Sequence, residues 1–334
     1  MLRIAIIGYG YWGPNLLRNF ASLSNCKITY LVDLKQQRLD VVNKLYPGIK
    51  TSIHTDDAIT SKDVDAIVIS TPVFTHYPLA KKALENGKHV LLEKPMTSTF
   101  AEAEELINIA TRKDLSLMVD HTFLYTGAVN KMKELVDEED IGSIKYFDST
   151  RINLGLFQPD INVLWDLAPH DISILHFLVK EKPYSVNAIG VSHTNNGIEN
   201  IAYLTINYQS NFIAHFHCSW SSPVKLRTIL IGGDKKMMVF NDLEPSEKIK
   251  IYDTRYDYKS DEEKKRLLVE YRTGDIYIPK VEVKEALAGM AADFVNSVLN
   301  KTTPLSNSQS GLEVIRILEA SQASIKNKGK EILL

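Results

Sequence analysis

A glycine-rich turn between an apolar run and a helix constrains this chain more than any other feature. Residues 2–13 read LRIAIIGYGYWG, so a β-type run breaks into G-x-G-x-x-G at Gly8, Gly10 and Gly13. Gly8 allows a tight turn off the strand, Gly10 lets the backbone approach a pyrophosphate, and Gly13 lets the next helix pack on the sheet. This context predicts a dinucleotide-binding turn.

An acidic residue about twenty positions further on strengthens that prediction. The second apolar run, CKITYLVD, ends on Asp33, whose carboxylate can accept both hydroxyls of an adenosine ribose. A 2′-phosphate would be repelled there, while the unpaired N–H groups at the helix N-terminus attract the diphosphate. The sequence therefore predicts NAD as the cofactor in preference to NADP.

Length and charge limit the class of protein. At 334 residues the chain exceeds what one core usually serves, and 44% hydrophobic with 24% charged residues is ordinary soluble composition. A formal net charge of −2 gives no general attraction to nucleic acid or anionic membranes, so we expect neither as a partner. Only Cys26 and Cys218 carry thiols, and we find no charged leader and no bilayer-long apolar run. We expect a reduced, cytoplasmic protein.

Strand-like and helix-like patterns alternate through residue 121. The strand-like runs are LRIAIIG, CKITYLVD, VDAIVIST, KHVLLEK and LSLMVDH. Such alternation predicts a doubly wound parallel sheet, so residues 1–121 are expected to form an α/β Rossmann domain.

The pattern changes after residue 122. Long strand-like runs follow one another, namely IKYFDSTRI, YSVNAIGVS, NIAYLTINY, NFIAHFHCSW, RTILIGG and KKMMVFN, and the chain ends on amphipathic helices. Residues 122–334 are therefore expected to form an α+β domain with a mainly antiparallel open sheet, for substrate binding and oligomerisation. The charged segment Glu244–Arg272 is expected to be a solvated hairpin or a flexible loop.

Two further motifs carry the chemistry. Glu93-Lys94-Pro95 lies where the fifth strand runs out, at the end of KHVLLEK and at the sheet edge where a nicotinamide lies in this architecture. WDLAPHD opens a helix in the second domain, and its Asp166 and His170 are spaced i, i+4 and share a helical face. Taken alone, Asp166 is typical of a carboxylate at a helix start, and His170 is typical of a partly buried histidine. Their spacing, together with the Glu93-Lys94-Pro95 motif, favours catalysis.

With the glycine turn and the Thr71-Pro72…His76 segment, these motifs resemble the Gfo/Idh/MocA family of sugar and cyclitol oxidoreductases, over essentially the whole chain. The resemblance implies three catalytic residues: Lys94 between nicotinamide and the reacting carbinol, His170 as acid/base, and Asp166 holding an adjacent hydroxyl. It implies a cofactor cleft that includes Thr71, Pro72, His76, Glu93 and Lys94, with Tyr11 and Trp12 in the glycine turn. It places His121, Arg151, Asn153 and Trp165 near the substrate, although Trp165 can equally be core.

The reaction requires these residue types independently of the family. Oxidising a secondary alcohol needs a hydride acceptor, a base for the hydroxyl proton and a cation for the developing alkoxide. An imidazole, with an ordinary pKa of about 6.5, suits the base, so we assign that role to His170 and the electrostatic role to Lys94.

Other polar clusters have simpler interpretations. His215 and His217 alternate on one strand, but no third ligand stands at metal spacing, so no metal is expected. Lys225, Arg227 and Arg272 can meet a substrate diphosphate or, as we prefer, form exposed solvated charge.

The sequence thus predicts an NAD-dependent sugar oxidoreductase. Residues 151–171 and 304–324 look most like dehydrogenases that oxidise the 3-hydroxyl of a UDP-linked N-acetylhexosamine or its uronate. The alternatives are a free sugar or inositol dehydrogenase, a dTDP-keto-sugar reductase, which Asp33 disfavours, and a non-catalytic NAD-binding regulator.

Two structural expectations accompany this reading. A homodimer or homotetramer is expected through the open sheet, one face of which carries Phe212, Phe216 and Trp220 or their alternating neighbours. The family resemblance also favours a cis Lys94–Pro95 bond.

Overall fold

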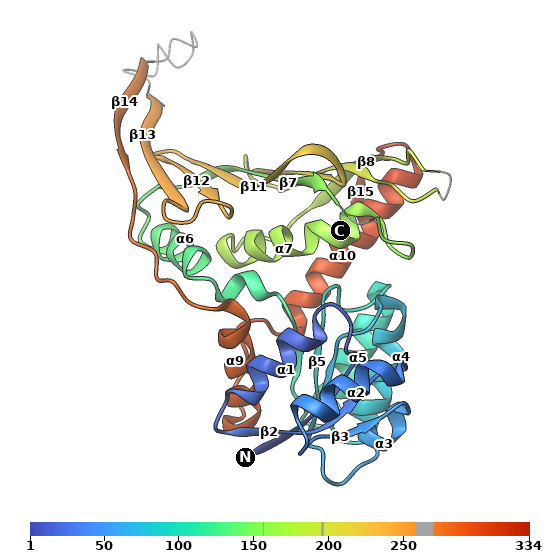
Figure 1. The fold of residues 1–334 in the computed structure, drawn as a ribbon. Helices are drawn as coiled ribbons and strands as arrows, with labels where there is room; N and C mark the ends of the chain where they lie inside the picture. The colour runs from blue at the N-terminus through green and yellow to red at the C-terminus, as the bar shows by residue number, and fades with distance from the viewer. Residues whose placement is uncertain (156, 195–196, 258–269) are drawn as a thin grey trace. The chain divides into compact units, whose positions relative to one another are not determined.

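The computed structural model describes residues 1–155, 157–194, 197–257 and 270–334, which form two compact units (Figure 1). The first unit joins Met1–Thr126 to Lys284–Glu319, and the second joins Gly127–Val283 to Ala320–Leu334. This division differs from the expected one at residues 121/122, because the chain returns to the first unit near its end. Helical periodicity shows which face of a C-terminal helix is apolar but not which core it covers.

The first unit is built on a six-stranded parallel sheet in the order β3-β2-β1-β4-β5-β6. Its strands are β1 (Leu2–Ile7), β2 (Cys26–Val32), β3 (Lys50–Ser52), β4 (Ala66–Ile69), β5 (His89–Leu92) and β6 (Leu117–Val119). Its helices are α1 (Gly13–Ala21), α2 (Gln36–Leu45), α3 (Thr55–Ile59), η1 (Val73–Thr75), α4 (His76–Glu85), α5 (Phe100–Arg112), η2 (Thr122–Tyr125), α9 (Ala286–Asn300) and the first part of α10 (Ser308–Lys326). This is the predicted doubly wound order.

Burial of both sheet faces explains why these strands are continuous apolar runs. Every residue of β4, Ala66–Ile69, is buried, as expected of a parallel strand covered by helices on both sides. The returning segment completes the core: Phe294 of α9 packs edge-to-face on Phe20, with ring centroids 6.3 Å apart. The backbone of Ser306 also extends the pairing at β6, where the Val119 N–H donates to its carbonyl at 3.1 Å.

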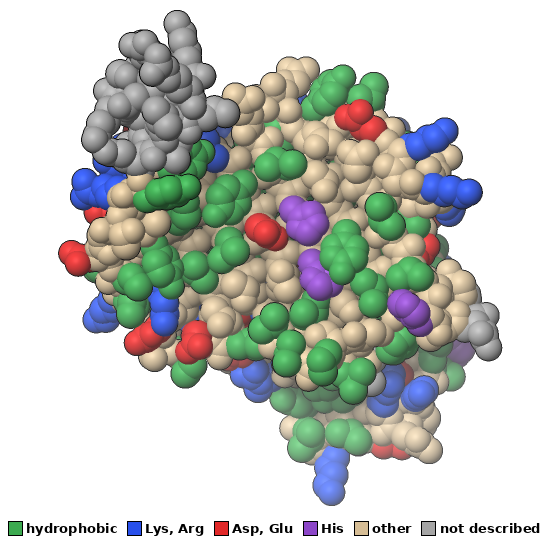
Figure 2. Space-filling model, turned by 90° about the horizontal axis from the view of Figure 1, so that it is seen from above, with side chains coloured by type: hydrophobic (Ala, Val, Ile, Leu, Met, Phe, Trp, Pro, Cys, Tyr) green, Lys and Arg blue, Asp and Glu red, His purple; other side chains and the backbone are tan. Residues whose placement is uncertain are grey.

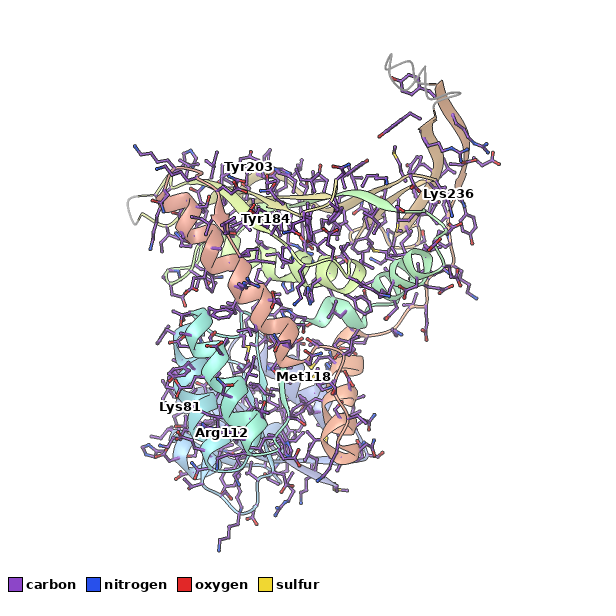
Figure 3. The ribbon with its side chains drawn as sticks, turned by 180° about the vertical axis from the view of Figure 1, so that it is seen from behind. Lys81, Arg112, Met118, Tyr184, Tyr203 and Lys236 are labelled. Atoms are coloured by element: carbon purple, nitrogen blue, oxygen red, sulfur yellow. The ribbon has the colours of Figure 1, made fainter. Side chains whose placement is uncertain are left out.

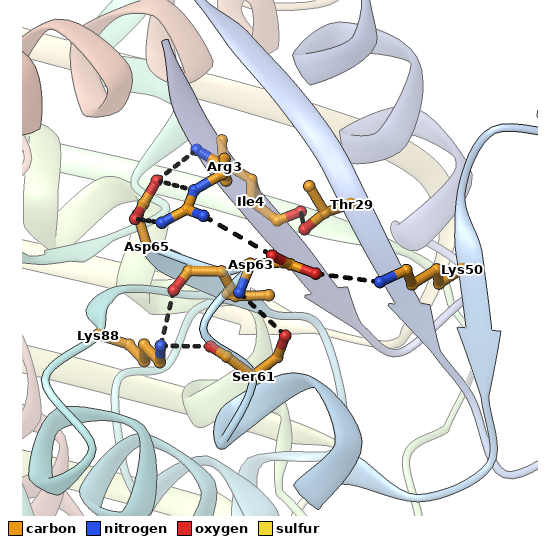
Figure 4. Close-up of polar contacts among 9 residues, drawn as sticks. Arg3, Ile4, Thr29, Lys50, Ser61, Asp63, Asp65 and Lys88 are labelled. Atoms are coloured by element: carbon orange, nitrogen blue, oxygen red, sulfur yellow. Dashed lines mark hydrogen bonds and ion pairs between the residues drawn. The ribbon is translucent and has the colours of Figure 1, made fainter.

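An ion pair and hydrogen bonds to backbone carbonyls join the segments at the amino ends of the parallel strands (Figure 4). Arg3 at the start of β1 makes two side-chain bonds to Asp65, 2.9 and 2.6 Å long, just before β4. The buried ammonium of Lys88 donates to the carbonyls of Ser61 and Val64, each at 2.7 Å. These contacts lie at the end of the sheet opposite the glycine turn, so we assign them to stability.

The second unit is built on a nine-stranded sheet in the order β14-β13-β12-β11-β7-β10-β9-β8-β15. Its strands are β7 (Ile144–Leu154), β8 (Ser185–Val191), β9 (Ile201–Asn207), β10 (Ile213–Ser219), β11 (Ser221–Gly233), β12 (Met237–Asn241), β13 (Ile249–Asp257), β14 (Glu270–Tyr277) and β15 (Ile332–Leu333), with helices α6 (Gly127–Asp137) and α7 (Val163–Leu178). Only β7 and β10 pair in parallel among these described strands, so the sheet is mainly antiparallel, as predicted.

The charged segment expected to be a hairpin or a loop contains β13 and the first residues of β14. β13 and β14 pair antiparallel, with Arg255 opposite Arg272. Residues 258–269, which also belong to that segment, lie outside the described residues.

One face of this sheet is covered by α7 and the other is open. Phe212, Phe216 and Trp220 are buried, so of the two alternating sets the sequence offered, this one faces the core. The neighbouring set faces out, where the Tyr203 ring stacks on His217 with centroids 4.6 Å apart. Figure 2 shows histidine and apolar side chains gathered on this face, and Tyr203 is labelled in Figure 3.

None of the helices in the described ranges is long and apolar enough to span a membrane.

Candidate functional site

The three glycines of the turn play separate roles. Gly8 has a φ of +102°, and a Cβ there would lie 2.2 Å from the Ser70 carbonyl oxygen. A Cβ on Gly13 would lie 2.4 Å from the carbonyl oxygen of Gly8, so helix and strand pack too closely for a side chain. At Gly10 the nearest atom would be 4.0 Å away, so this position borders open space. That is the arrangement a pyrophosphate needs, with backbone accessible at the middle glycine.

The start of α1 suits a negatively charged group. Its first turn contains Pro14 and no acidic residue, so no carboxylate of that turn opposes the positive end of the helix dipole. Tyr11 and Trp12 sit in the turn with rings 5.2 Å apart, and Tyr11 is 80% exposed. Both therefore lie in the glycine turn, and their contact with a bound dinucleotide stays a prediction.

Asp33 is held more firmly than its sequence position indicated. Its carboxylate accepts the backbone N–H of Tyr9 at 2.7 Å and that of Lys35 at 2.8 Å. Arg38 Nη1 also approaches it, at 3.0 Å from Oδ2. Sequence reasoning missed Arg38, although its place five residues after the acid, on the first turn of α2, was the available signal. The carboxylate is thus fixed by two backbone N–H groups and paired with a guanidinium.

The residues after β4 are joined to those after β5. The buried ring of His76 lies between two carbonyls, with Nε2 2.8 Å from the Thr71 oxygen and Nδ1 3.0 Å from the Pro95 oxygen. Thr71 Oγ1 lies 2.6 Å from Thr75 Oγ1, which donates to the carbonyl of Pro72. His76 therefore connects the predicted cofactor cleft to the Glu93-Lys94-Pro95 motif.

That motif follows β5, and its Lys94–Pro95 bond is cis, as expected. The backbone N–H of Lys94 lies 3.2 Å from Glu93 Oε2. At the end of the neighbouring β6, Asp120 and His121 are buried, and the His121 N–H donates to Ser306 Oγ at 3.3 Å. Sequence reasoning did not single out Asp120, because its closeness to Glu93 depends on strand pairing.

In the second unit, α7 carries the predicted acid and base. Its N-cap is Asn162, whose Oδ1 accepts the N–H groups of Leu164 and Trp165, each at 3.1 Å. Asp166 and His170 are both partly exposed, whereas Ala168 and Pro169 between them are buried. The i, i+4 spacing thus places both side chains on the less buried side of this helix.

Trp220, which the sequence analysis assigned only to the sheet, contacts the predicted site residue Asp166. Its Nε1 donates to Asp166 Oδ2 at 3.1 Å, and Phe157 packs beside it with ring centroids 5.5 Å apart. A Cβ on Gly155 would lie 2.8 Å from Trp220 Cδ1 and 3.1 Å from Asn153 Nδ2. Asn153 and Asp166, both predicted near the substrate, therefore surround the same indole.

Arg151 and Trp165 are placed deeper than the other predicted substrate residues. The Arg151 guanidinium is buried and bonds Asp171 through Nε at 2.8 Å and Nη2 at 2.5 Å, while Ser149 Oγ donates to Asp171 at 2.8 Å. Trp165 is 8% exposed. The Arg151–Asp171 pair fixes α7 to β7, so Arg151 orients the helix that carries His170.

The predicted residues thus form two described groups. The first unit brings the glycine turn, Asp33, His76, Lys94 and His121 to the carboxyl end of its sheet. The second unit brings Asn153, Asp166 and His170 to the start of α7 and the strands beside it.

Comparison with known proteins identifies the class. Residues 2–121 match the NAD-binding Rossmann-fold model of the Gfo/Idh/MocA oxidoreductase family, and residues 129–239 match the C-terminal domain model of the same family. The chain belongs to this family, and its first domain binds NAD.

Individual relatives share modest sequence identity with this chain. The chain is 30% identical over 211 residues to the UDP-N-acetylglucosamine 3-dehydrogenase of Acidithiobacillus ferrooxidans, covering 62% of this chain and 64% of the relative. The matches span from 41% to 64% of the length of the first three curated relatives.

Solved structures share the fold over nearly the whole chain. A structure of the Acidithiobacillus dehydrogenase GnnA has a TM-score of 0.77 at 22% identity, covering 97% of this chain and 99% of that one. The structure of GenD2 from gentamicin A biosynthesis, in complex with NAD, has a TM-score of 0.83 at 18% identity, covering 100% and 96%.

Proposed function

We propose that this protein is an NAD-dependent dehydrogenase that oxidises a secondary hydroxyl of a sugar. The observation that carries the proposal is the pair Asp166 and His170 on α7, with Trp220 bonded to the acid. Lys94 after β5 adds the cation that this chemistry needs. A regulator that only binds NAD would have no use for these three side chains together.

Each residue has a distinct role in the proposed reaction. When bound, NAD supplies the acceptor for the hydride that leaves the sugar carbon. His170 takes the proton of the reacting hydroxyl, and the Lys94 ammonium stabilises the negative charge that develops on its oxygen. Asp166, held by Trp220, accepts a hydrogen bond from a neighbouring hydroxyl and so orients the ring.

For the substrate we propose the 3-hydroxyl of a UDP-linked N-acetylhexosamine or its uronate. The Acidithiobacillus relative, a UDP-N-acetylglucosamine 3-dehydrogenase, supports this choice. An inositol or free sugar dehydrogenase is the main alternative, because an inositol 2-dehydrogenase of Rhodococcus erythropolis is 26% identical over 204 residues. A dTDP-keto-sugar reductase using NADP is less favoured, because the Asp33 carboxylate would repel a 2′-phosphate.

We also propose that the enzyme works in the cytoplasm as a homodimer or homotetramer, with neither nucleic acid nor membrane as a partner. The open face of the second unit's sheet supports the oligomer, because Ile189, Tyr203 and Ile213 remain 64%, 46% and 46% exposed on it.

A substrate panel tests the function. The purified protein would be incubated with NAD and UDP-N-acetylglucosamine, its uronate, free hexoses and inositol, and NADH formation would be followed by absorbance. Mass spectrometry should show a product lighter by two hydrogens for the UDP-linked sugars, and the His170→Asn variant serves as control. Oxidation of inositol alone would replace the substrate proposal, and binding of NAD without turnover of any alcohol would refute the dehydrogenase.

A further inference from the structure

Two carboxyl groups that the proposed reaction does not use lie side by side at the end of the parallel sheet. β5 and β6 pair with Leu92 opposite Val119, so the next residues, Glu93 and Asp120, are neighbours on adjacent strands about 4.8 Å apart. The Asp120 N–H donates to the Leu92 carbonyl at 2.7 Å, which extends the pairing to this position. Both side chains are buried, at 9% and 2% exposure.

Two ionised carboxylates at that depth would repel each other strongly, and sharing one proton removes the repulsion. Burial raises the pKa of Asp120 to about 6. Burial, and then the charge of Asp120, raises the pKa of Glu93 well above its ordinary range. Thr122 Oγ1 donates to Asp120 Oδ1 at 2.5 Å, which favours Asp120 as the ionised member. Glu93 therefore holds the proton and donates to Asp120.

The charge that remains lies close to Lys94. Its ammonium lowers the pKa of both carboxyls, and its backbone N–H bonds Glu93 Oε2 at 3.2 Å, which orients that carboxyl. Two ionised acids would place two negative charges beside one ammonium. One shared proton gives a single negative charge beside a single positive one.

We propose that Glu93 and Asp120 share one proton at neutral pH and act together as one fixed negative charge that attracts and orients the Lys94 ammonium. They are positioning residues for Lys94, and this role rests on the proposed dehydrogenase function.

Other titratable groups lie near Glu93 and Asp120, and their titration must be distinguished from that of the two carboxyls. Tyr125 on η2 has a raised pKa, mainly through burial, and its hydroxyl donates to Asp293 of α9 at 2.6 Å, so it stays neutral near neutral pH. The imidazoles of His76 and His121 lie in the neighbouring segments. Because they are unchanged in variants at positions 93 and 120, differences between those variants belong to the carboxyl pair.

Infrared spectroscopy tests the shared proton without any activity. The full-length wild-type protein at neutral pH should show the carbonyl stretch of a buried protonated carboxyl, shifted on exchange into D2O. Glu93→Gln and Asp120→Asn should each lose this band, because the remaining acid ionises. Glu104→Gln, which removes an exposed acid on α5, should keep it. Absence of the band from the wild type, or its persistence in both single variants, would overturn the proposal.

The double variant Glu93→Gln/Asp120→Asn tests the effect on Lys94. Each single variant keeps one negative charge, so the alkaline limb of its pH–rate profile should stay near the wild-type position. The double variant removes the charge, and the limb should move to lower pH by about one unit or more. An unmoved limb would overturn the positioning role.

If no alcohol proves to be a substrate, the same shift is measured by NMR of lysines labelled at the ε-carbon, with Lys94→Met assigning the signal. Failure of the dehydrogenase proposal is thereby distinguished from failure of this one.

Discussion

Asp33 shows how one residue's contacts refine a role that the sequence assigned to it alone. Bonds from the Tyr9 and Lys35 backbones fix its carboxylate, and Arg38 lies at 3.0 Å. We therefore expect selection of the cofactor to depend on a carboxylate and a guanidinium together, because an arginine beside the ribose is also the group that accommodates a 2′-phosphate.

Cofactor choice should follow this pair. The wild type should bind NAD(H) at least about tenfold more tightly than NADP(H), a difference of about 1.4 kcal/mol. Asp33→Ser should weaken NAD and strengthen NADP, because it removes the repulsion and frees Arg38 for the phosphate. Adding Arg38→Gln should cancel the NADP gain. Calorimetry checks all three, and equal affinities in the wild type would contradict the expectation.

Replacing the proposed base should change the pH profile. His170→Asn should keep its affinity for NAD, lose roughly 10²–10⁴ in turnover and lose the acidic limb of the rate profile. Single-turnover reduction of NAD at several pH values measures this. A near wild-type rate with an unchanged profile would make His170 structural.

The matched variants separate the other two roles. Lys94→Met should lower turnover while the acidic limb persists, because the histidine is intact. Asp166→Asn should mainly raise the Michaelis constant, since its role is to hold a substrate hydroxyl. Steady-state kinetics on the same sugar distinguish the two patterns.

At the scale of single residues, the sequence could predict those candidate site residues that belong to a short motif. Lys94, Asp166 and His170 stand in short motifs whose spacing is visible in one dimension. Trp220, Arg38 and Asp120 acquire their roles from a partner brought close by folding: Trp220 through Asp166, Arg38 through Asp33, and Asp120 through Glu93. No local pattern encodes such a contact.

Among the elements, α7 depends on a buried ion pair. Nε and Nη2 of Arg151 both donate to the Asp171 carboxylate. The side chains of Arg151 and Asp171 are 5% and 2% exposed. Cutting one partner leaves an uncompensated buried charge, so the pair constrains where the helix can lie against β7.

Asp171→Asn should therefore lower the free energy of unfolding by about 3–5 kcal/mol. Urea titrations followed by circular dichroism measure it. The control is Asp253→Asn, which breaks the more exposed pair with Arg272 and should leave the free energy of unfolding nearly unchanged. Similar small losses in both variants would mean that the buried pair does not fix α7.

Elements with strong periodicity were predictable, and short or polar ones were not. β1 and β4 are continuous apolar runs bordered by turn or helix signals, and so could be predicted as strands. β3 has only three residues, Lys50–Ser52, and no apolar pattern. Alternation on β10 showed two faces but not which one α7 would cover. That choice is made by packing on Phe216 and Trp220, not by strand propensity.

For the whole molecule, the open sheet face predicts self-association. Light scattering at micromolar concentration should give a dimer or a tetramer. Tyr203→Lys, which places a charge within the exposed Tyr203–His217 stack, should shift the protein toward monomer, whereas Tyr271→Lys on β14 should not. A monomeric wild type would contradict the oligomer.

The carboxyl pair should also shape acid stability. The pKa of Asp120 is raised to about 6 in the folded state, above its ordinary unfolded value of about 3.9. The folded state then binds the extra proton between these values, so this group's contribution to stability falls as pH rises from about 4 to about 6. Denaturant melts across that range should show a smaller fall for Asp120→Asn.

The discontinuous first unit imposes an order on synthesis. Its sheet and most of its helices are encoded before residue 127, yet Phe294 and Ser306, which close its core, emerge from the ribosome only after the whole of the β-rich segment. The first unit therefore stays incomplete while the second unit's central strands are translated. A nascent chain stalled before residue 284 should be sensitive to protease within its first 126 residues, and translation of α9 and the start of α10 should protect them.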